Sequence, residues 1–222
     1  MRIVALLALS AVLFPASKVT LVASGDLNEP FGVDFDKSGA MFVVELAGNK
    51  VRRLDKDGKL TVIAGTGEKG AAGDGGPAAK AQFNGPHHLL VGADGDVWVA
   101  DTWNHCVRRI DLKTGVITRA VGSGEKGYAG DGGPAAQAKF GGIYCLAFDA
   151  KRENLYLADL DNRRIRVVNL KSGIVTTVAG NGQKGVPQDG AEAKAQPLVD
   201  PRAVAVDSKG NVYVLERGGH AL

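Results

Sequence analysis

Short runs of apolar and β-branched residues recur along this chain of 222 residues, with glycine, proline, asparagine or aspartate between them. Near the start of the chain such runs cover residues 32–35, 41–45, 51–54 and 60–64. Runs of this length, with a turn between each pair, are typical of antiparallel strands. The pattern therefore predicts an all-β protein built from short strands.

The same set of four predicted strands then repeats along the chain. An acidic residue closes the second strand of every set, at Glu45, Asp101, Asp159 and Glu216, so the spacings are 56, 58 and 57 residues. A fixed period of this size marks a repeat architecture, and four antiparallel strands per repeat form the blade of a β-propeller. We expect blades near residues 29–65, 84–122, 141–180 and 200–222, the last of them incomplete.

Residues 18–25 resemble the fourth strand of each repeat, although they stand first in the chain. A strand of this kind is expected to pair with the final blade and close the ring. The chain then holds about 3.5 blades, whereas propellers close with roughly 4–8. We expect a partial ring from a longer protein, six-bladed when complete, or an assembly of half-propellers. An open edge of such a ring is prone to self-association.

A glycine-rich connector separates the repeats, at residues 65–83 and again, almost unchanged, at 122–140. Proline followed by Ala-Ala-x-Ala predicts about one and a half turns of helix, whose end Phe83 and Phe140 would fix against the blade. The aspartate of each Gly-Asp-Gly-Gly segment, Asp74 or Asp131, is expected to cap a turn or helix, and a calcium site is the alternative.

Composition, at 45% apolar and 23% charged residues, fits a soluble globular protein. The apolar run 3–14 behind Arg2 is too short to span a bilayer and fits a secretory signal peptide over residues 1–17. We therefore expect a secreted or periplasmic protein without a stable membrane span. The net charge of +3 decides little about polyanionic partners, but export leads us to expect no nucleic-acid partner.

Two cysteines, Cys106 and Cys145, occupy different places in the repeat, and we expect free, partly buried thiols.

Several segments resemble the NHL repeat of β-propellers, in a version similar to that of bacterial exported members. The matching segments run over residues 30–36, 95–101, 159–166 and 210–214. Each segment carries one of three patterns of that repeat: Pro-x-Gly-Val-x-x-Asp, a Gly-Asn/Asp-Val-Tyr type of turn, or Asp-x-x-Asn-x-x-Ile-Arg. The resemblance implies a propeller fold but says little about chemistry, because function depends on sites placed on a fold.

One position differs in every repeat, although the sequence around it recurs. The first residue of the innermost strand, which in a propeller faces the channel mouth, is Phe31, His87, Tyr144 or Arg202. We predict that these four bind a ligand, and that His87, Tyr144 and Arg202 could act as acid–base or substrate-orienting groups. Trp103 and His105 occur only in the second repeat, on a loop, and are further candidates for ligand contact.

The Pro-His pair at His87 resembles the zinc-binding positions of peptidyl-hydroxyglycine lyase propellers, in which several blades each supply one histidine. Here one blade supplies it, and zinc requires three or four ligands, so no metal site is assigned and a divalent metal stays an open alternative. The repeated carboxylates and the repeated arginines Arg52, Arg108 and Arg166 are expected to be structural partners.

Taken together, these features favour an exported propeller that serves as a binding module for a protein, peptide or carbohydrate. The alternative is a propeller hydrolase or lyase, similar to gluconolactonases or peptidyl-hydroxyglycine lyases, with its site at the channel mouth.

Overall fold

The computed structural model describes residues 20–23 and 27–218. Three four-stranded antiparallel sheets follow one another in chain order, and a two-stranded sheet comes after them. The first contains β1 (Pro30–Phe35), β2 (Met41–Glu45), β3 (Lys50–Leu54) and β4 (Leu60–Ala64). The second contains β5 (His88–Val91), β6 (Val97–Asp101), β7 (Cys106–Ile110) and β8 (Ile117–Val121). The third contains β9 (Ile143–Phe148), β10 (Asn154–Asp159), β11 (Arg164–Asn169) and β12 (Ile174–Ala179), and the last β13 (Pro201–Val206) and β14 (Val212–Glu216).

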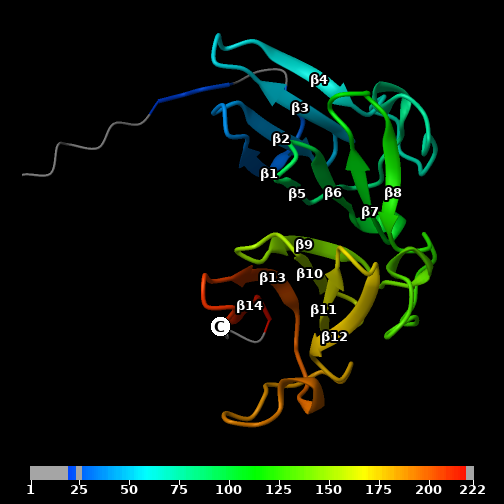
Figure 1. Cartoon of the computed structure of the whole chain (residues 1–222), viewed down its shortest axis with the longest axis vertical. Coiled ribbons are helices and arrows are strands. Elements are labelled where there is room, and N and C mark those ends of the chain that lie inside the picture. The colour runs from blue at the N-terminus through cyan, green and yellow to red at the C-terminus, as the bar shows by residue number, and fades with distance from the viewer. Residues whose placement is uncertain (1–19, 24–26, 219–222) are drawn as a thin grey trace, which may run out of the picture.

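The sheets are arranged as successive blades of an arc, which confirms the predicted all-β propeller architecture (Figure 1). The first strands of the blades, β1, β5, β9 and β13, lie on the concave side and pack against one another in succession. The fourth strands β4, β8 and β12 lie at the periphery. Residues at the start of the inner strands are therefore brought toward one region of the molecule.

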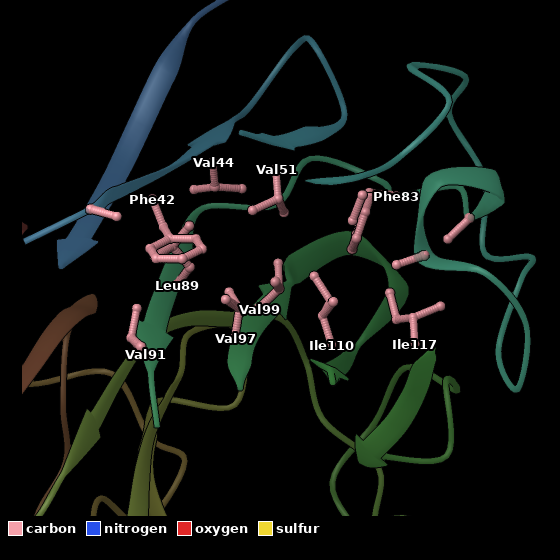
Figure 2. Close-up of a cluster of buried hydrophobic side chains, with 14 residues drawn as sticks. Phe42, Val44, Val51, Phe83, Leu89, Val91, Val97, Val99, Ile110 and Ile117 are labelled. Atoms are coloured by element: carbon pink, nitrogen blue, oxygen red, sulfur yellow. The ribbon is translucent and has the colours of Figure 1, made fainter. Parts of the chain in front are cut away.

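Apolar side chains fill the space between neighbouring blades. Between the first two blades, Phe42, Val44 and Val51 face Leu89, Val99 and Ile110, and all six are fully buried (Figure 2). Burial of one such side chain contributes about 1.5–3 kcal/mol. Phe83 joins this cluster and Phe140 the next one, as the sequence predicts.

The connectors contain less helix than expected. Each holds one turn of 3₁₀ helix, η1 (Ala78–Lys80) or η3 (Ala135–Gln137), because the backbone returns to the extended conformation at the next residue. The preceding segment instead pairs with the outer strand of the following blade. Gly75 N donates to Ile117 O at 2.7 Å, and Ala78 N donates to Gly115 O at 2.8 Å. The connector thus covers the outer edge of β8, an edge that would otherwise be open to pairing with another chain.

A glycine is required where each connector leaves its blade. Gly65 has φ of 93°, and a Cβ there would lie 2.3 Å from the carbonyl oxygen of Asn49. Gly122 and Gly180 repeat this geometry against the carbonyls of His105 and Arg163. Close approach and a positive φ together explain why the repeat keeps glycine here.

Apolar side chains are exposed at both ends of the arc. Phe31, Val33 and Phe35 alternate along β1 and are 51%, 51% and 57% exposed. On β14, Tyr213 and Leu215 are also exposed. These faces match the expected open flanks, while self-association stays a prediction.

The expected signal peptide, 1–17, lies outside the described residues. Of the expected closing strand, residues 20–23 are described; they form no strand, and Leu21 and Val22 are exposed. The described part of the chain contains no helix that is long and apolar enough to cross a membrane.

Candidate functional site

Four side chains from four different blades meet at the concave side of the arc. The ring centroids of His87 and Tyr144 lie 4.2 Å apart, and Phe31 meets both rings edge-on, at 4.9 and 5.9 Å. The guanidinium of Arg202 lies over the Tyr144 ring, 4.5 Å from its centroid. We call Phe31, His87, Tyr144 and Arg202, with Trp103, the mouth cluster. The structure therefore brings together all four inner-strand residues selected from the sequence, and their role in binding stays a prediction.

A backbone carbonyl and a threonine hydroxyl fix the ring of His87. Its Nδ1 lies 2.7 Å from the carbonyl oxygen of Gly85 and 3.0 Å from Thr102 Oγ1, while the Thr102 hydroxyl donates to Ile143 O at 2.7 Å. Because a carbonyl only accepts, Nδ1 carries the proton in the neutral ring, and Nε2 keeps a free lone pair. Burial lowers the pKa of His87, the Gly85 hydrogen bond opposes that shift, and the charge of Arg202 adds to it. His87 is thus neutral at pH 7.

Arg202 is oriented by a neighbour on the same blade. Its Nε donates to Asp200 Oδ1 at 3.0 Å, and both side chains are about one-fifth exposed, at 22% and 19%. The guanidinium therefore keeps one flat face on Tyr144 and retains donors for a ligand.

Trp103 extends the mouth cluster at its edge. Its ring meets His87 edge-on at 5.6 Å, and the side chain is 40% exposed. A Cβ on Gly85 would lie 2.5 Å from Trp103 Cδ1, and one on Gly142 would lie 3.3 Å from Cζ3. Two glycines from neighbouring blades therefore make room for the indole.

His105 is the other loop candidate, and its neighbours are charged groups of the second and third blades. It follows the 3₁₀ turn η2 (Thr102–Asn104) with φ of 56°, and it faces Lys126 and Asp161. Burial and the charge of Lys126 lower its pKa, while a hydrogen bond with the Gly141 backbone and the charge of Asp161 oppose the shift. Among the described residues, its ring makes no aromatic contact with His87 or Trp103.

Thr102 is a residue of the site that the sequence prediction missed. The equivalent position holds leucine in the neighbouring repeats, at Leu46 and Leu160. A hydroxyl in place of a leucine, beside a non-repeated tryptophan, is the sequence feature that could have revealed it. Its hydroxyl links His87 to β9, so it couples two blades at the site.

The family of the protein follows from its repeats. The family model for the NHL repeat matches residues 83–110, which cover β5 to β7, and the same four-stranded pattern recurs in the other blades. The chain therefore contains an NHL repeat within a β-propeller fold.

Two curated relatives carry NHL repeats in their names. The chain is 34% identical over 118 residues to NHL repeat-containing protein 2 of Gallus gallus, covering 52% of this chain and 16% of that protein. It is 28% identical over 177 residues to the Bos taurus protein of the same name, covering 75% of this chain and 24% of that protein. The chain thus spans less than a quarter of these relatives.

This chain aligns with about half the length of solved structures that share its fold. A Bacteroides thetaiotaomicron protein of unknown function superposes with a TM-score of 0.69 at 20% identity, over 87% of this chain and 46% of that one. A streptogramin B lyase gives 0.55 at 17% identity, over 88% and 51%. A Xanthomonas campestris gluconolactonase gives 0.55 at 17% identity, over 84% and 56%. At these identities the likeness shows the fold alone.

Repeated charges in these NHL repeats hold the blades together, as predicted. Glu45 accepts from Arg52 Nε at 2.9 Å, and Asp101 and Asp159 accept from the backbone amides of Asn84 and Gly141 at 2.8 and 2.7 Å. The two amide contacts tie the ends of β6 and β10 to the start of their own blades, and the Arg52 contact ties the end of β2 to β3.

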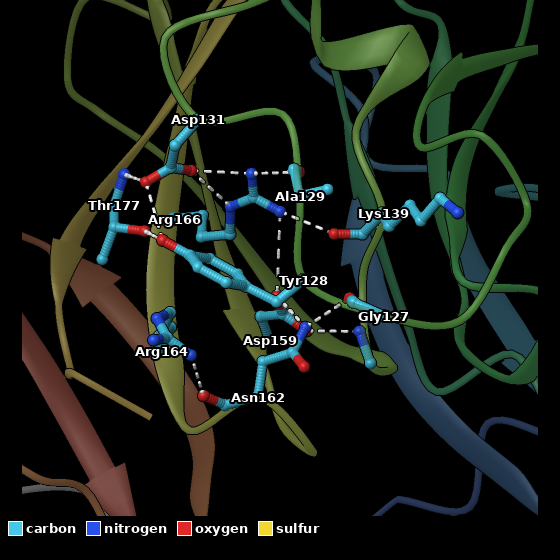
Figure 3. A network of polar contacts seen from close by, with 11 residues as sticks. Gly127, Tyr128, Ala129, Asp131, Lys139, Asp159, Asn162, Arg164, Arg166 and Thr177 are labelled. Carbon is cyan, nitrogen blue, oxygen red and sulfur yellow. Dashed lines mark hydrogen bonds and ion pairs between the residues drawn. The ribbon is translucent and has the colours of Figure 1, made fainter. Parts of the chain in front are cut away.

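The arginines of the second and third blades have a nearer partner than expected. Arg108 and Arg166 lie 3.7 and 3.9 Å from Asp101 and Asp159, but 3.0 and 2.7 Å from Asp74 and Asp131. Figure 3 shows this network in the third blade. The connector aspartates therefore pair with buried arginines, and the preferred expectation that they cap a turn or helix is replaced by this ion pair.

Metal ligands do not gather in the part of the chain that the structure describes, where no three His, Cys, Asp or Glu side chains form a metal-binding group. Cys106 and Cys145 are free and buried, as predicted. Burial raises the pKa of both thiols, which makes them poor nucleophiles at neutral pH.

Proposed function

We propose that this NHL propeller is a binding module whose mouth cluster holds a segment of a protein or peptide. The observation that carries the proposal is the convergence of the non-repeated inner-strand residues into one aromatic and cationic surface. Tryptophan, tyrosine and arginine are the residue types that contribute most to protein–protein binding energy. Here one of each lies in contact with the same group of rings.

Exposure within the mouth cluster supports this use. Phe31 is 51% and Trp103 40% exposed, while His87 between them is only 5% exposed. The buried histidine fixes the positions of the rings, and the two exposed rings offer apolar faces to a ligand. Arg202 adds hydrogen-bond donors at one side, which suits a backbone carbonyl or a carboxylate of the bound segment.

The test uses a library of displayed random peptides. Peptides selected on the wild-type protein are measured again on Phe31→Ala and Tyr144→Ala, with an expected loss of affinity of about 30-fold for each. Phe35→Ala is the matched control, because Phe35 lies on the same strand and is 57% exposed but makes no ring contact with the cluster among the described residues. Equal binding by all four proteins, or loss in the control alone, contradicts the proposal.

A second function is favoured by the geometry of His87. A neutral imidazole, held at Nδ1 by Gly85 and Thr102, presents Nε2 as a proton acceptor beside Tyr144 and Arg202. This is the arrangement that a general base in a hydrolase or lyase needs. Proteins of the same fold include a streptogramin B lyase and a gluconolactonase, so a streptogramin and a sugar lactone are the substrates to assay first.

Turnover separates the two functions. Wild-type protein and His87→Gln are assayed with a sugar lactone and a streptogramin B antibiotic, and a general-base role predicts a loss of rate of about a hundredfold or more in the variant. Because the pKa of His87 is lowered, the rate of the wild type should hold at pH values below the ordinary histidine value near 6.5. Peptide binding without turnover of either substrate leaves the binding module as the function.

A further inference from the structure

A cavity of about 200 Å³ lies in the second blade, apart from the inner strands. Its lining includes Ala71, Asp74, Arg108 and Arg119, and Trp103 forms the wall that it shares with the mouth cluster. A cavity of this size in a blade otherwise packed like its neighbour requires an explanation.

The third blade shows what the same place holds when it is filled. The connector residue equivalent to Ala71 is Tyr128. Its hydroxyl donates to Asp131 Oδ2 at 3.1 Å and lies 3.2 Å from Thr177 Oγ1 (Figure 3). Arg164 and Arg166 lie over its ring, at 3.7 and 5.2 Å from the centroid. A phenol is therefore held by a carboxylate and two guanidinium groups.

Both guanidinium groups are also present in the second blade. Arg108 is equivalent to Arg166, and its side chain is 1% exposed. The second one comes from another strand: Arg119 on β8 donates to Ser123 O at 2.6 Å, where Arg164 on β11 donates to Asn181 O at 2.7 Å. A Cβ on Gly124 would meet Arg119 Nη1, just as a Cβ on Gly182 would meet Arg164 Nη1. The two guanidinium groups thus reach the same place from different strands.

The carboxylate of the second blade has a vacant oxygen. Asp74 Oδ1 accepts from Arg108 Nε and Nη2, both at 3.0 Å. No described residue donates to its Oδ2, whereas Asp131 Oδ2 accepts from Thr177 N as well as from Tyr128. The second blade therefore keeps the charged groups that hold Tyr128 in the third, and lacks the ring.

We propose that the cavity between Ala71, Asp74, Arg108 and Arg119 binds a phenolic group supplied from outside the blade. The hydroxyl donates to Asp74 Oδ2, and the guanidinium groups of Arg108 and Arg119 face the ring, as in the internal template. The volume is sufficient, because a cavity of roughly 150 Å³ can hold benzene. The site shares Trp103 with the mouth cluster but contains none of its four inner-strand residues, and it is tested with other probes and other variants, so this proposal and the proposed function can fail independently.

The experiment measures binding of p-cresol and toluene to the wild-type protein by isothermal titration calorimetry. The two probes differ only in the hydroxyl. We expect p-cresol to bind at one site in the millimolar range and toluene at least about tenfold more weakly, since a hydrogen bond to a charged acceptor is lost. Equal binding of the two probes, or binding of neither, overturns the proposal.

Substitutions at Ala71 and Tyr128 test where p-cresol binds. Ala71→Tyr puts a tyrosine where the third blade has one, so it should abolish p-cresol binding, while the control Ala71→Ser should retain it. Tyr128→Ala opens the same space in the third blade and should raise the number of sites from one to two. Retained p-cresol binding by folded Ala71→Tyr, judged by circular dichroism, overturns the assignment.

A last arm identifies the source of the phenol. N-acetyl-tyrosinamide carries the same group as part of an amino acid. If it binds and competes with p-cresol, the cavity accepts a tyrosine side chain of a protein or peptide. If p-cresol alone binds, the ligand is a free phenol.

Discussion

The second and third blades have the same strand order and the same pairs of buried arginine and aspartate, yet they differ where their connectors fold over the sheet. In both, an asparagine amide bridges a connector carbonyl and the repeated aspartate, through Asn104 at 2.7 and 2.8 Å and Asn162 at 2.7 and 2.8 Å. Only the third blade fills the adjoining space, with Tyr128. Repeated positions therefore hold the blade, and the non-repeated ones decide whether it is closed or keeps a cavity.

The same separation applies to the mouth cluster. Positions that recur, such as Asp101 and Asp159, are fully buried and satisfied within their own blades. Positions that differ, such as Phe31 and Tyr144, come together from different blades. In a repeat protein, variation at an otherwise repeated position is thus a better guide to a site than repetition is.

Among the substitutions that compare the two blades, loss of a buried arginine should lower the stability most. Arg166→Ala leaves Asp131 without its cation and unfilled space beside Tyr128 and Phe140, so the free energy of unfolding should fall by about 3–5 kcal/mol. In Arg108→Ala the free energy of unfolding should fall by slightly less, because Arg108 packs against Phe83 and no tyrosine stacks on it. Urea denaturation measures both.

The control for these arginines is Arg109→Ala. Arg109 is 41% exposed and pairs with Asp94, which is 49% exposed, and with Asp96, which is 5% exposed. Because the arginine itself is half in solvent, its loss should cost about 1–2 kcal/mol, less than the loss of a fully buried arginine. A loss in Arg166→Ala no greater than in Arg109→Ala would show that the buried ion pairs do not hold the blades.

The contribution of the repeated aspartate to stability should depend on pH differently in the second and third blades. Burial raises the pKa of Asp101 to about 7 and that of Asp159 to about 6, against hydrogen bonds and the nearby arginines, which lower them. A raised pKa means that the folded state binds the proton more tightly. Each group's contribution is therefore complete below the unfolded value near 4 and is lost as the pH rises through the folded pKa.

Measured as wild type minus variant, the stability advantage over Asp101→Asn should fall by roughly 1 kcal/mol per pH unit up to about pH 7. The advantage over Asp159→Asn should stop falling near pH 6. Urea titrations at pH 5, 6, 7 and 8 check this. Differences that are flat with pH in both variants would mean that neither carboxyl titrates in this window.

Removing the Tyr128 hydroxyl tests the hydrogen bonds that hold this ring in the third blade. Tyr128→Phe loses the hydrogen bonds with Asp131 and Thr177 and should cost about 1 kcal/mol. Tyr213→Phe is the matched control, since Tyr213 is 45% exposed against 43% for Tyr128 and its hydroxyl donates to one partner, Asp207, at 3.2 Å, so it should cost less than about 0.5 kcal/mol. The thermal midpoints of the two variants should differ accordingly, and equal midpoints would argue against a structural role of the phenol.

Filling the cavity of the second blade should give the smallest effect. Ala71→Tyr supplies the missing ring and should raise the free energy of unfolding by about 0.5–1 kcal/mol, in the range of other cavity-filling changes. A drop in stability would show that Cys106 and Arg119 do not accept a ring as Arg164 and Thr177 do.

The sequence by itself determined the strands, their period and the positions of the mouth cluster. Alternating apolar residues and turn residues predicted β2 and β4 with the observed bounds, because these features act over a few neighbouring residues. The period then placed Phe31, His87, Tyr144 and Arg202 at one point of successive blades, and the structure brings them into contact.

Only the tertiary structure decided how the connectors are used. Asp74 stands 34 residues before Arg108, and no local pattern links the two. They meet because the connector crosses to the next blade and pairs along β8, which is a contact between distant segments. The same crossing sets Ala71 over one blade and Tyr128 over the next, and so leaves one cavity open and the other filled. The two residues differ in the sequence, but what each of them contacts depends on packing between segments far apart in the chain, which no single stretch of residues encodes.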